Sequence, residues 1–434
     1  MRWRIANQDT AALAPPARAA LHAAGDRAFT LGAIAISAGY YRAALALWPP
    51  DAQVQRAGLL RLLGTMQFEA GDLDQAEATL AEGTEAAASA GLAAMEARIR
   101  ILLAEIRNQR GGPMAAALTE CETAIAVLDS EGDLEGLAEA WLLVGRLRFF
   151  GGEWPADKEG LERAAEYARQ SGNHRAHALA ISWLGFVFTE LPVPADEAIA
   201  RVEQLLQTTT GEPWAEAHLL MSLSMLYAYA GRFSDARVAC SRGRSILAGS
   251  AARLQVAETA LPAGEMELIV GDLAAAERYL REGYDALRAM GERGYLSSFA
   301  GALAGVLYAQ GRLDDAYQMT EEAQAAAADD DFDAQARWRV TRAKLLAGRG
   351  EFPAARRLAD EAEALVSPTS SAVTKARILM DKAEVNKLTG APEQAAASLR
   401  AALRISKDRH ATVLADQAMA ALASLTDHPS AKPA

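Results

Sequence analysis

The sequence predicts an all-α fold, a right-handed α-solenoid of about ten stacked helix pairs with a period near 40 residues. The first observation is a glycine-containing phrase that recurs along most of the chain. The second is composition: helix-favouring residues are abundant, aromatic residues make up only 6%, and period-two alternation is scarce. The third is length, because 434 residues exceed what one compact core accommodates.

The recurring phrase is a glycine followed two residues later by a large apolar residue and five residues later by alanine. It is clearest at residues 71–76 and returns at 231–236, 271–276 and 311–316. With weaker copies, and with Pro192 where one glycine is due, the series runs 71, 111, 152, 192, 231, 271, 311, 350 and 390, in steps of 39 to 41. An earlier copy at Gly39 precedes the series by a shorter step of 32.

Each position in the phrase has a mechanical role. Glycine adopts positive φ without steric cost and can therefore end one helix. The large residue anchors the start of the next helix, and the alanine is small where two helices approach closely. Nine places after the glycine comes a packing residue such as Leu80 or Leu280. The phrase therefore predicts a tight turn between the two helices of each pair.

A second set of breaks falls between these turns, so the chain is expected to alternate a long helix, a tight turn, a slightly shorter helix and a loop. We expect an N-terminal lead-in over residues 1–18 and the solenoid over residues 19–424. A capping helix is expected at Thr412–Ser424, followed by a disordered tail over residues 425–434, which lacks packing residues.

Charge and cysteine content exclude several classes of protein. The net charge is −12 and no block of lysine and arginine stands out, so nucleic acid is not an expected partner. No stretch reaches the length of uncharged apolar residues that a membrane span requires. Only Cys121 and Cys240 occur, far apart in sequence, which predicts a reducing, cytoplasmic environment.

At these residues the chain resembles the tetratricopeptide repeat (TPR). That pattern has a Leu-Gly-type pair ending seven residues before the turn glycine, as at Leu63-Gly64, Val144-Gly145 and Leu184-Gly185. It also has an aromatic residue four before the glycine, as at Tyr227, and an alanine five after it. The resemblance covers nearly the whole chain, although the period near 40 exceeds the usual 34 and implies longer helices.

More narrowly, residues 24–28, 40–49 and 209–218 are similar to the C-terminal repeats of actinobacterial proteins that join a nucleotide cyclase to a STAND-like ATPase, and to LuxR-type regulators. In such proteins the resemblance implies that the superhelix senses an inducer or partner and restrains the ATPase. The catalytic parts of that family are absent from this sequence, which holds neither a Gly-x-x-x-x-Gly-Lys-Ser/Thr loop nor a terminal basic helix-turn-helix.

The sequence predicts no enzyme, no metal site and no cofactor. His174 and His177 share a helix face but lack a third ligand at fixed spacing. Cys240 stands where other repeats have leucine, so it is expected to be buried as a small apolar residue, and Cys121 likewise. The acidic stretch at 329–333 lacks EF-hand spacing and is expected to be a solvated connection between helices.

A partner-binding groove is expected on the first helix of each pair, because the TPR resemblance implies that this helix lines the concave surface. Its inward side chains are implied at about ten, six, three and two residues before the turn glycine. Aromatic residues, methionines and arginines recur at binding surfaces. These offsets select Arg61, Phe68, Arg146, Phe149, Phe150, Phe186, Met221, Met225, Tyr229, Tyr308 and Lys344.

The sequence therefore predicts a non-catalytic module that binds a protein or peptide and acts as a sensor or scaffold in a bacterial regulatory system. One alternative is a sensor that binds a small molecule or signalling peptide inside the superhelix. Another is a self-assembling scaffold. The sequence leaves the oligomeric state open.

Overall fold

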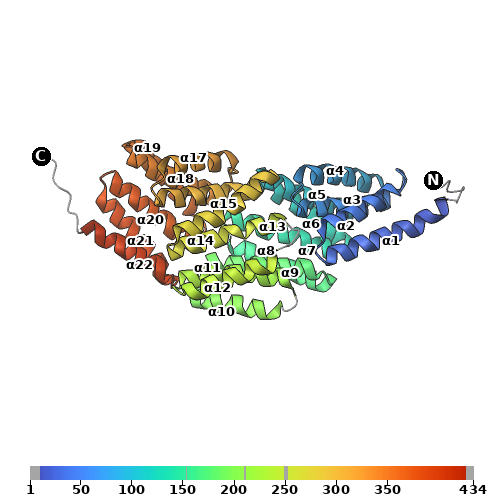
Figure 1. The fold of residues 1–434 in the computed structure, drawn as a ribbon, viewed down its shortest axis with the longest axis horizontal. Coiled ribbons are helices and arrows are strands. Elements are labelled where there is room, and N and C mark those ends of the chain that lie inside the picture. Colours follow the sequence, from blue (N-terminus) through green and yellow to red (C-terminus); the bar gives the residue numbers. More distant parts are fainter. Residues whose placement is uncertain (1–9, 153, 210–211, 249–252, 427–434) are drawn as a thin grey trace, which may run out of the picture.

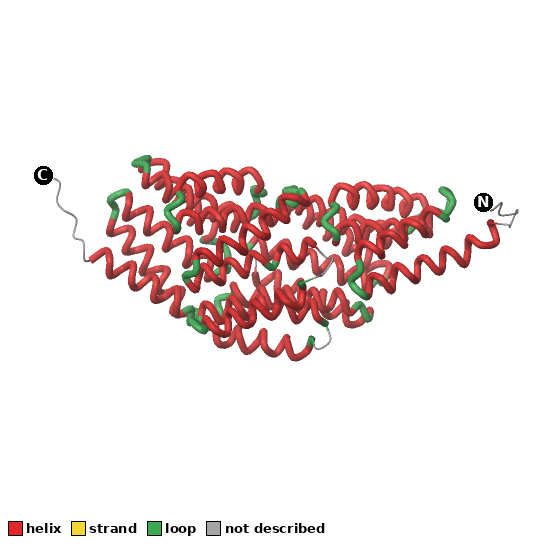
Figure 2. The backbone as a smooth tube through the Cα atoms, in the orientation of Figure 1, coloured by secondary structure: helices red, strands yellow, loops and turns green. Residues whose placement is uncertain are grey.

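The computed structural model describes residues 10–152, 154–209, 212–248 and 253–426, and within these ranges the regular secondary structure is helical, without strands (Figure 2). The helices are α1 (Thr10–Thr30), α2 (Ile34–Ala46), α3 (Gln53–Glu69), α4 (Leu73–Ser89), α5 (Ala93–Gln109), α6 (Met114–Glu131), α7 (Leu134–Gly151), α8 (Trp154–Ser171), α9 (His174–Glu190), α10 (Ala195–Thr208), α11 (Pro213–Tyr229), α12 (Phe233–Leu247), α13 (Arg253–Glu258), α14 (Ala260–Val270), α15 (Leu273–Met290), α16 (Gly294–Ala309), α17 (Leu313–Ala326), α18 (Phe332–Gly348), α19 (Phe352–Val366), α20 (Ala372–Leu388), α21 (Pro392–Asp408) and α22 (Thr412–Thr426).

These helices confirm the predicted all-α solenoid (Figure 1). Within the described residues they form ten pairs, from α1 with α2 to α20 with α21, and α22 follows as the terminal helix. In the seventh pair the first helix is broken at Thr259 into α13 and α14.

Turn glycines end the first helix of most pairs, as the sequence predicts. Gly71, for example, has a φ of 78°, and the amide of Asp72 donates to the carbonyl of Gln67 at 2.8 Å. Of the other glycines in the predicted series, those at 111, 152, 231, 271, 311, 350 and 390 also have positive φ. The turn at Pro192 is the exception, and α9 ends there without a glycine.

The first turn lies earlier than the sequence phrase indicates. Gly39 is inside α2, and the turn is made instead by Gly32, whose φ is 70°. Gly32 precedes Gly71 by 39 residues, so the first pair keeps the period of the others. The signal was hidden because Ser37 stands where later pairs have alanine; it is fully buried, and its hydroxyl donates to the carbonyl of Gly25 at 2.9 Å.

The ends of the solenoid differ slightly from the expected boundaries. Helix α1 begins at Thr10, so residues 10–18, expected as a lead-in, belong to the first pair. The capping helix is α22, which extends two residues beyond the expected Ser424. The predicted tail lies outside the described residues from 427 onward.

Small residues seven places before the turn allow the two helices of a pair to touch. A Cβ atom built on Gly64 would lie 2.5 Å from Leu80 Cγ, and one on Gly145 would lie 2.6 Å from Leu161 Cγ. These leucines stand nine places after the turn glycine. In these pairs the sequence phrase therefore encodes a direct glycine-to-leucine contact that sets how closely the two helices pack.

The solenoid winds back onto itself, so that the first helices of the second to fifth pairs contact the first helix five pairs later, and α11 contacts the terminal helix α22. The contacts join α3 to α13, α5 to α16, α7 to α18, α9 to α20 and α11 to α22. Backbone hydrogen bonds also join the two superhelical turns, from the Arg293 amide to the Gln109 carbonyl at 2.6 Å and from the Ser370 amide, before α20, to the Gly152 carbonyl, after α7, at 3.3 Å. The later superhelical turn thus stacks against the C-terminal ends of the earlier first helices.

Candidate functional site

An open groove lies between α1, α3 and α5, at the N-terminal end of the inner surface, and is called here the N-terminal groove. It encloses about 600 Å³. Its apolar floor includes Trp48, Leu59, Leu62 and Met95. Helix α3 also contributes Gly58, where an added Cβ would meet nothing within 4 Å. The volume and apolar lining are those of a typical ligand-binding cleft.

Three basic side chains, Arg18, His22 and Arg61, lie around this floor, and none of the residues that line the groove is acidic. The Arg18 guanidinium lies 4.1 Å from the centre of the Trp48 ring, so a cation and an aromatic face are presented together. In a chain whose net charge is −12, two arginines make this groove locally basic, and His22 is paired with Asp26 at 3.3 Å. Its electrostatics therefore favour an acidic ligand.

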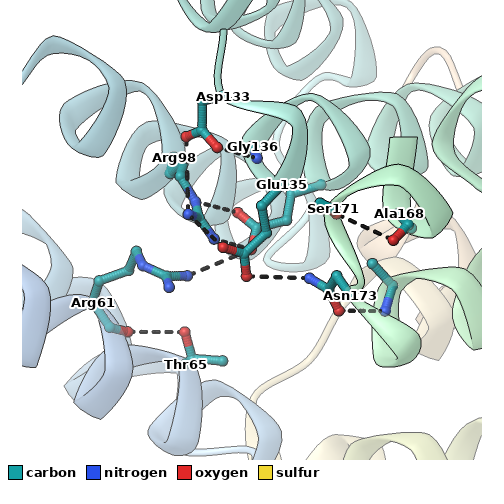
Figure 3. A network of polar contacts seen from close by, with 11 residues as sticks. Arg61, Thr65, Arg98, Asp133, Glu135, Gly136, Ala168, Ser171 and Asn173 are labelled. Carbon is teal, nitrogen blue, oxygen red and sulfur yellow. Dashed lines mark hydrogen bonds and ion pairs between the residues drawn. The ribbon is translucent and has the colours of Figure 1, made fainter. Parts of the chain in front are cut away.

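Arg61, the predicted site residue in this groove, also belongs to a network of ion pairs that crosses several inner helices (Figure 3). Its Nη1 atom lies 3.5 Å from Glu139 Oε1, and Glu139 also accepts hydrogen bonds from Arg98 at 2.8 and 3.0 Å. Arg98 extends the network to Glu135, whose other oxygen accepts from Asn173 at 3.2 Å. The network ties together α3, α5, α7 and the start of α9.

The charges in this network stabilise one another. Although burial raises the pKa of Glu135, its hydrogen bond to Arg98 and the nearby positive charges hold that pKa below its ordinary value. The Nε atom of Arg61 is buried without a hydrogen-bond partner among the described residues, and its Nη1 atom faces Glu139.

Four of the predicted residues, Arg146, Phe149, Phe150 and Phe186, come together in an aromatic cluster on α7 and α9. Trp183 is at its centre: its ring lies 5.7 Å from Phe149, 5.9 Å from Phe150 and 5.6 Å from Phe186, measured between ring centres.

The Arg146 guanidinium lies 5.1 Å from the centre of the Trp183 ring and donates to the Tyr295 hydroxyl at 3.3 Å. Both adjacent phenylalanines are half-buried, so neither is fully accessible. The cluster also contacts the later superhelical turn, because the Phe150 and Tyr295 ring centres are 5.5 Å apart.

The structure places four other predicted residues within packed interiors. Phe68 belongs to the large core that joins both superhelical turns, and Met221, Met225 and Tyr229 belong to a core between α11, α12, α14 and the last helices. Each is at most 5% exposed. A partner could touch them only after the surrounding helices moved.

The last two predicted residues form a polar cluster on the later turn. The Lys344 ammonium lies 2.7 Å from Asp381 Oδ1 and 4.5 Å from the centre of the Tyr308 ring. The Tyr308 hydroxyl donates to Glu384 at 2.7 Å. These side chains satisfy one another, and Lys344 is only 7% exposed.

The sequence offsets missed Arg18, His22 and Trp48, which the structure places in the open groove. The signal was present, since His22 stands ten residues before Gly32, the offset that selects Arg61 relative to Gly71. Because the first turn was assigned to Gly39, the offsets for this pair were not applied to α1.

The cysteines and His218, whose side chains could be reactive, are buried, and burial shifts their pKa values away from neutral pH. Burial raises the pKa of Cys121 to about 12 and that of Cys240 to about 11, so both thiols stay protonated. Burial, followed by the Arg146 charge, lowers the pKa of His218 to about 4. In the acidic stretch, Asp331 caps α18 by accepting from the Ala334 amide at 3.0 Å.

In the part of the chain that the structure describes, no group of three or more His, Cys, Asp and Glu side chains could hold a metal ion. None of the described helices has the length and apolar character needed to traverse a bilayer.

No family model and no curated protein sequence matches this chain. Solved structures resemble it. A Rap protein complexed with competence and sporulation factor aligns over 84% of this chain and 99% of its own, with a TM-score of 0.60 and 16% identity. The human IFIT1 dimer with m7Gppp-AAAA aligns over 86% and 81%, with a TM-score of 0.50 and 13% identity. These neighbours are TPR-like repeat proteins, and the likeness shows that this chain has the TPR-like superhelical fold.

Proposed function

We propose that this chain is a non-catalytic TPR-like module that binds a segment of a partner protein or a peptide in the N-terminal groove. The observation that carries the proposal is the groove itself: about 600 Å³, apolar at its floor, basic at its sides and open in the folded chain. An extended segment with an apolar side chain beside a carboxylate meets both features. The apolar group would lie on Trp48 and Leu62, and the carboxylate would face Arg18 and Arg61.

The wider role follows from the sequence resemblance described above. On that basis we extend the proposal to a sensor or scaffold within a bacterial regulatory system, in which occupation of the groove is the signal. The similar Rap protein is itself in complex with competence and sporulation factor. At 16% identity this shows what such a fold can hold, and the proposal for this chain rests on its own groove.

The test is a peptide selection followed by an affinity measurement. A phage-displayed peptide library is panned on the purified chain, and the selected peptides are measured by fluorescence anisotropy. Gly58→Leu adds an apolar side chain at the groove, at a position where an added Cβ meets nothing within 4 Å. We expect at least about a tenfold loss of affinity, the effect of removing an apolar anchor site.

The matched control is Gly39→Leu, the same change on the exposed surface of α2 outside the groove, where an added Cβ also meets nothing. It should bind the peptides as the unmodified chain does. If no peptide is selected, or if Gly58→Leu binds as well as the control, the groove is not the binding site and the proposal fails.

A further inference from the structure

Helix α9 ends without a turn glycine, so its last carbonyl groups lack the capping bonds that such a turn provides. A side chain from the far end of the chain takes over this role. Arg409, between α21 and α22, donates from Nη2 to the carbonyls of Phe188 at 2.9 Å and Thr189 at 2.5 Å. Its Nη1 donates to the carbonyls of Leu191 and Val193.

Arg409 is only 2% exposed. Its positive charge lies at a helix C-terminus, where the helix dipole favours a cation, and each bond is strengthened by the charge of the donor. The one pair in the series without a turn glycine is thus completed by a residue more than 200 positions later. The irregular turn is the place where the end of the chain is attached.

Further bonds surround this contact. The Ala195 amide donates to the Arg409 carbonyl at 2.8 Å, and the Ser371 hydroxyl donates to Glu190 Oε2 at 2.7 Å. At the exposed edge, His410 Nδ1 lies 3.0 Å from Asp196 Oδ1. In each of these bonds the partner that comes later in the sequence lies within residues 371–426, which include α20, α21 and α22. This segment is called here the C-terminal clasp.

The clasp covers the inner face of α11. Met225 and Tyr229, 4% and 1% exposed, pack in one apolar cluster with Val373, Ala411 and Leu414 of the clasp. Phe186 of α9 lies against the same cluster. These are residues that the repeat offsets assign to the partner-binding surface. In the folded chain its own C-terminal helices occupy that surface.

The covered contact is imperfectly satisfied. The Tyr229 hydroxyl and Arg409 Nε are buried without a hydrogen-bond partner among the described residues. Burial raises the pKa of Glu190 to about 7, despite the hydrogen bond from Ser371. The unpaired polar atoms and the buried Glu190 carboxyl weaken the contact, whereas the hydrogen bonds donated by Arg409 stabilise it. This combination suits a contact that opens and closes as a unit.

We propose that the C-terminal clasp is a reversible cover, which attaches through Arg409 to the end of α9 and, when released, exposes an interaction surface formed by Phe186, Met225 and Tyr229. The exposed surface fits an amphipathic helix with small aliphatic residues, because α20 and α22 present Val373, Ala411 and Leu414 to it. This surface is separate from the N-terminal groove, and the inference does not depend on the function proposed for that groove.

Hydrogen exchange of the full chain tests whether the clasp opens. The Ala195 amide reports on this junction, and the Arg293 amide, bonded to Gln109, reports on a different junction between the superhelical turns. In the unmodified chain, Ala195 and the amides of α22 should exchange together and faster than Arg293. Arg409→Ala should increase the Ala195 rate at least about tenfold and leave Arg293 unchanged, because it removes charge-assisted bonds at one junction only.

Oxidative footprinting of the same proteins tests what the opening exposes. Arg409→Ala should increase the oxidation of Met225 severalfold, whereas Met66, buried in the core of the N-terminal pairs, should not change. The matched control is Arg404→Ala, which removes the same charge from the exposed surface of α21. It should leave both measurements as in the unmodified chain.

The proposal is overturned if Arg409→Ala leaves Ala195 and Met225 as protected as in the unmodified chain. It is also overturned if only α22 exchanges faster while Met225 stays protected, because that result describes fraying of a terminal helix. Should Arg409→Ala fail to fold, the unmodified chain decides. An Ala195 amide that exchanges only as slowly as Arg293, by global unfolding, excludes a separate opening of the clasp.

Discussion

The N-terminal groove and the inner face of α11 are both made by first helices of their pairs, yet one is open and the other is covered. Arg61, in the middle of α3, has a side chain that is 18% exposed, whereas Phe68, near the end of the same helix, is 5% exposed. Met225 and Tyr229 also lie near the end of their helix and are buried. The difference arises because the later superhelical turn stacks on the C-terminal ends of the earlier helices.

The offset of a residue from its turn glycine therefore gives the direction of its side chain but not its accessibility. Direction is a local property, set by helical periodicity and the position of the turn. Accessibility depends on how many pairs complete one superhelical turn. That number is set by the small rotation between neighbouring pairs, summed over many pairs. An inner surface can therefore be a binding groove in one stretch and a core in the next.

The largest expected effect comes from placing a charge in both regions. Met225→Glu should destabilise the chain by about 3–5 kcal/mol, because the carboxylate has no partner in that apolar cluster. Val54→Glu, at a position 53% exposed on the edge of the groove, should change stability by no more than about 0.5 kcal/mol. Urea unfolding followed by circular dichroism at 222 nm measures both. Equal shifts in the unfolding midpoint would contradict the contrast between open and covered surfaces.

The sequence was sufficient for the architecture, because the period and the turn glycines are local signals repeated many times. It placed the first turn wrongly at Gly39, since Ser37 replaces the alanine of the phrase at the true first turn. The attachment of Arg409 to the end of α9 could not be predicted. No local pattern links a C-terminal arginine to carbonyl groups more than 200 residues earlier, and only the missing glycine at Pro192 marked the site as unusual.

The candidate site was predicted in part. Arg61 was selected by its offset, and it lies in the open groove. Trp48 was not selected, because it follows α2, the second helix of the first pair, and no rule for first helices reaches it. The aromatic cluster around Trp183 contains predicted residues, but the sequence could not show that Tyr295 of the later turn would join it.

A smaller effect is expected from alanine substitutions at two glycines of α3, whose stability changes should have opposite signs if the groove is open. A Cβ on Gly64 would lie 2.5 Å from Leu80 Cγ, so Gly64→Ala should destabilise the chain by about 1–3 kcal/mol. Gly58 faces open space in the groove, so Gly58→Ala should stabilise it by about 0.5–1 kcal/mol through helix propensity alone. Thermal unfolding of the two variants gives the sign of each change. A loss of stability in Gly58→Ala would mean that the groove is closed at this point.

The smallest expected effect is a pH dependence of the free energy of unfolding, which arises from carboxyl groups buried at the junctions between the superhelical turns. Burial raises the pKa of Glu190 and Asp331 to about 7, and that of Glu258 and Glu292 to about 8. At these four groups the folded chain therefore binds more protons than the unfolded chain between the ordinary carboxyl pKa and about pH 8. Their contribution to the free energy of unfolding falls as the pH rises through that window.

Glu190→Gln isolates the part of this dependence that arises under the clasp, because glutamine keeps the shape and stays neutral. The variant should match the unmodified chain at pH 5 and have a Tm roughly 1–3 °C higher at pH 8, in scanning calorimetry. Glu166→Gln is the control: hydrogen bonds from Arg169 and Gln170 lower the pKa of Glu166 to about 2, so it is ionised throughout this range in both states. It should leave the slope between pH 5 and 8 unchanged. If Glu190→Gln also leaves the slope unchanged, Glu190 is hydrated in solution, and the covered surface is already open at the end of α9.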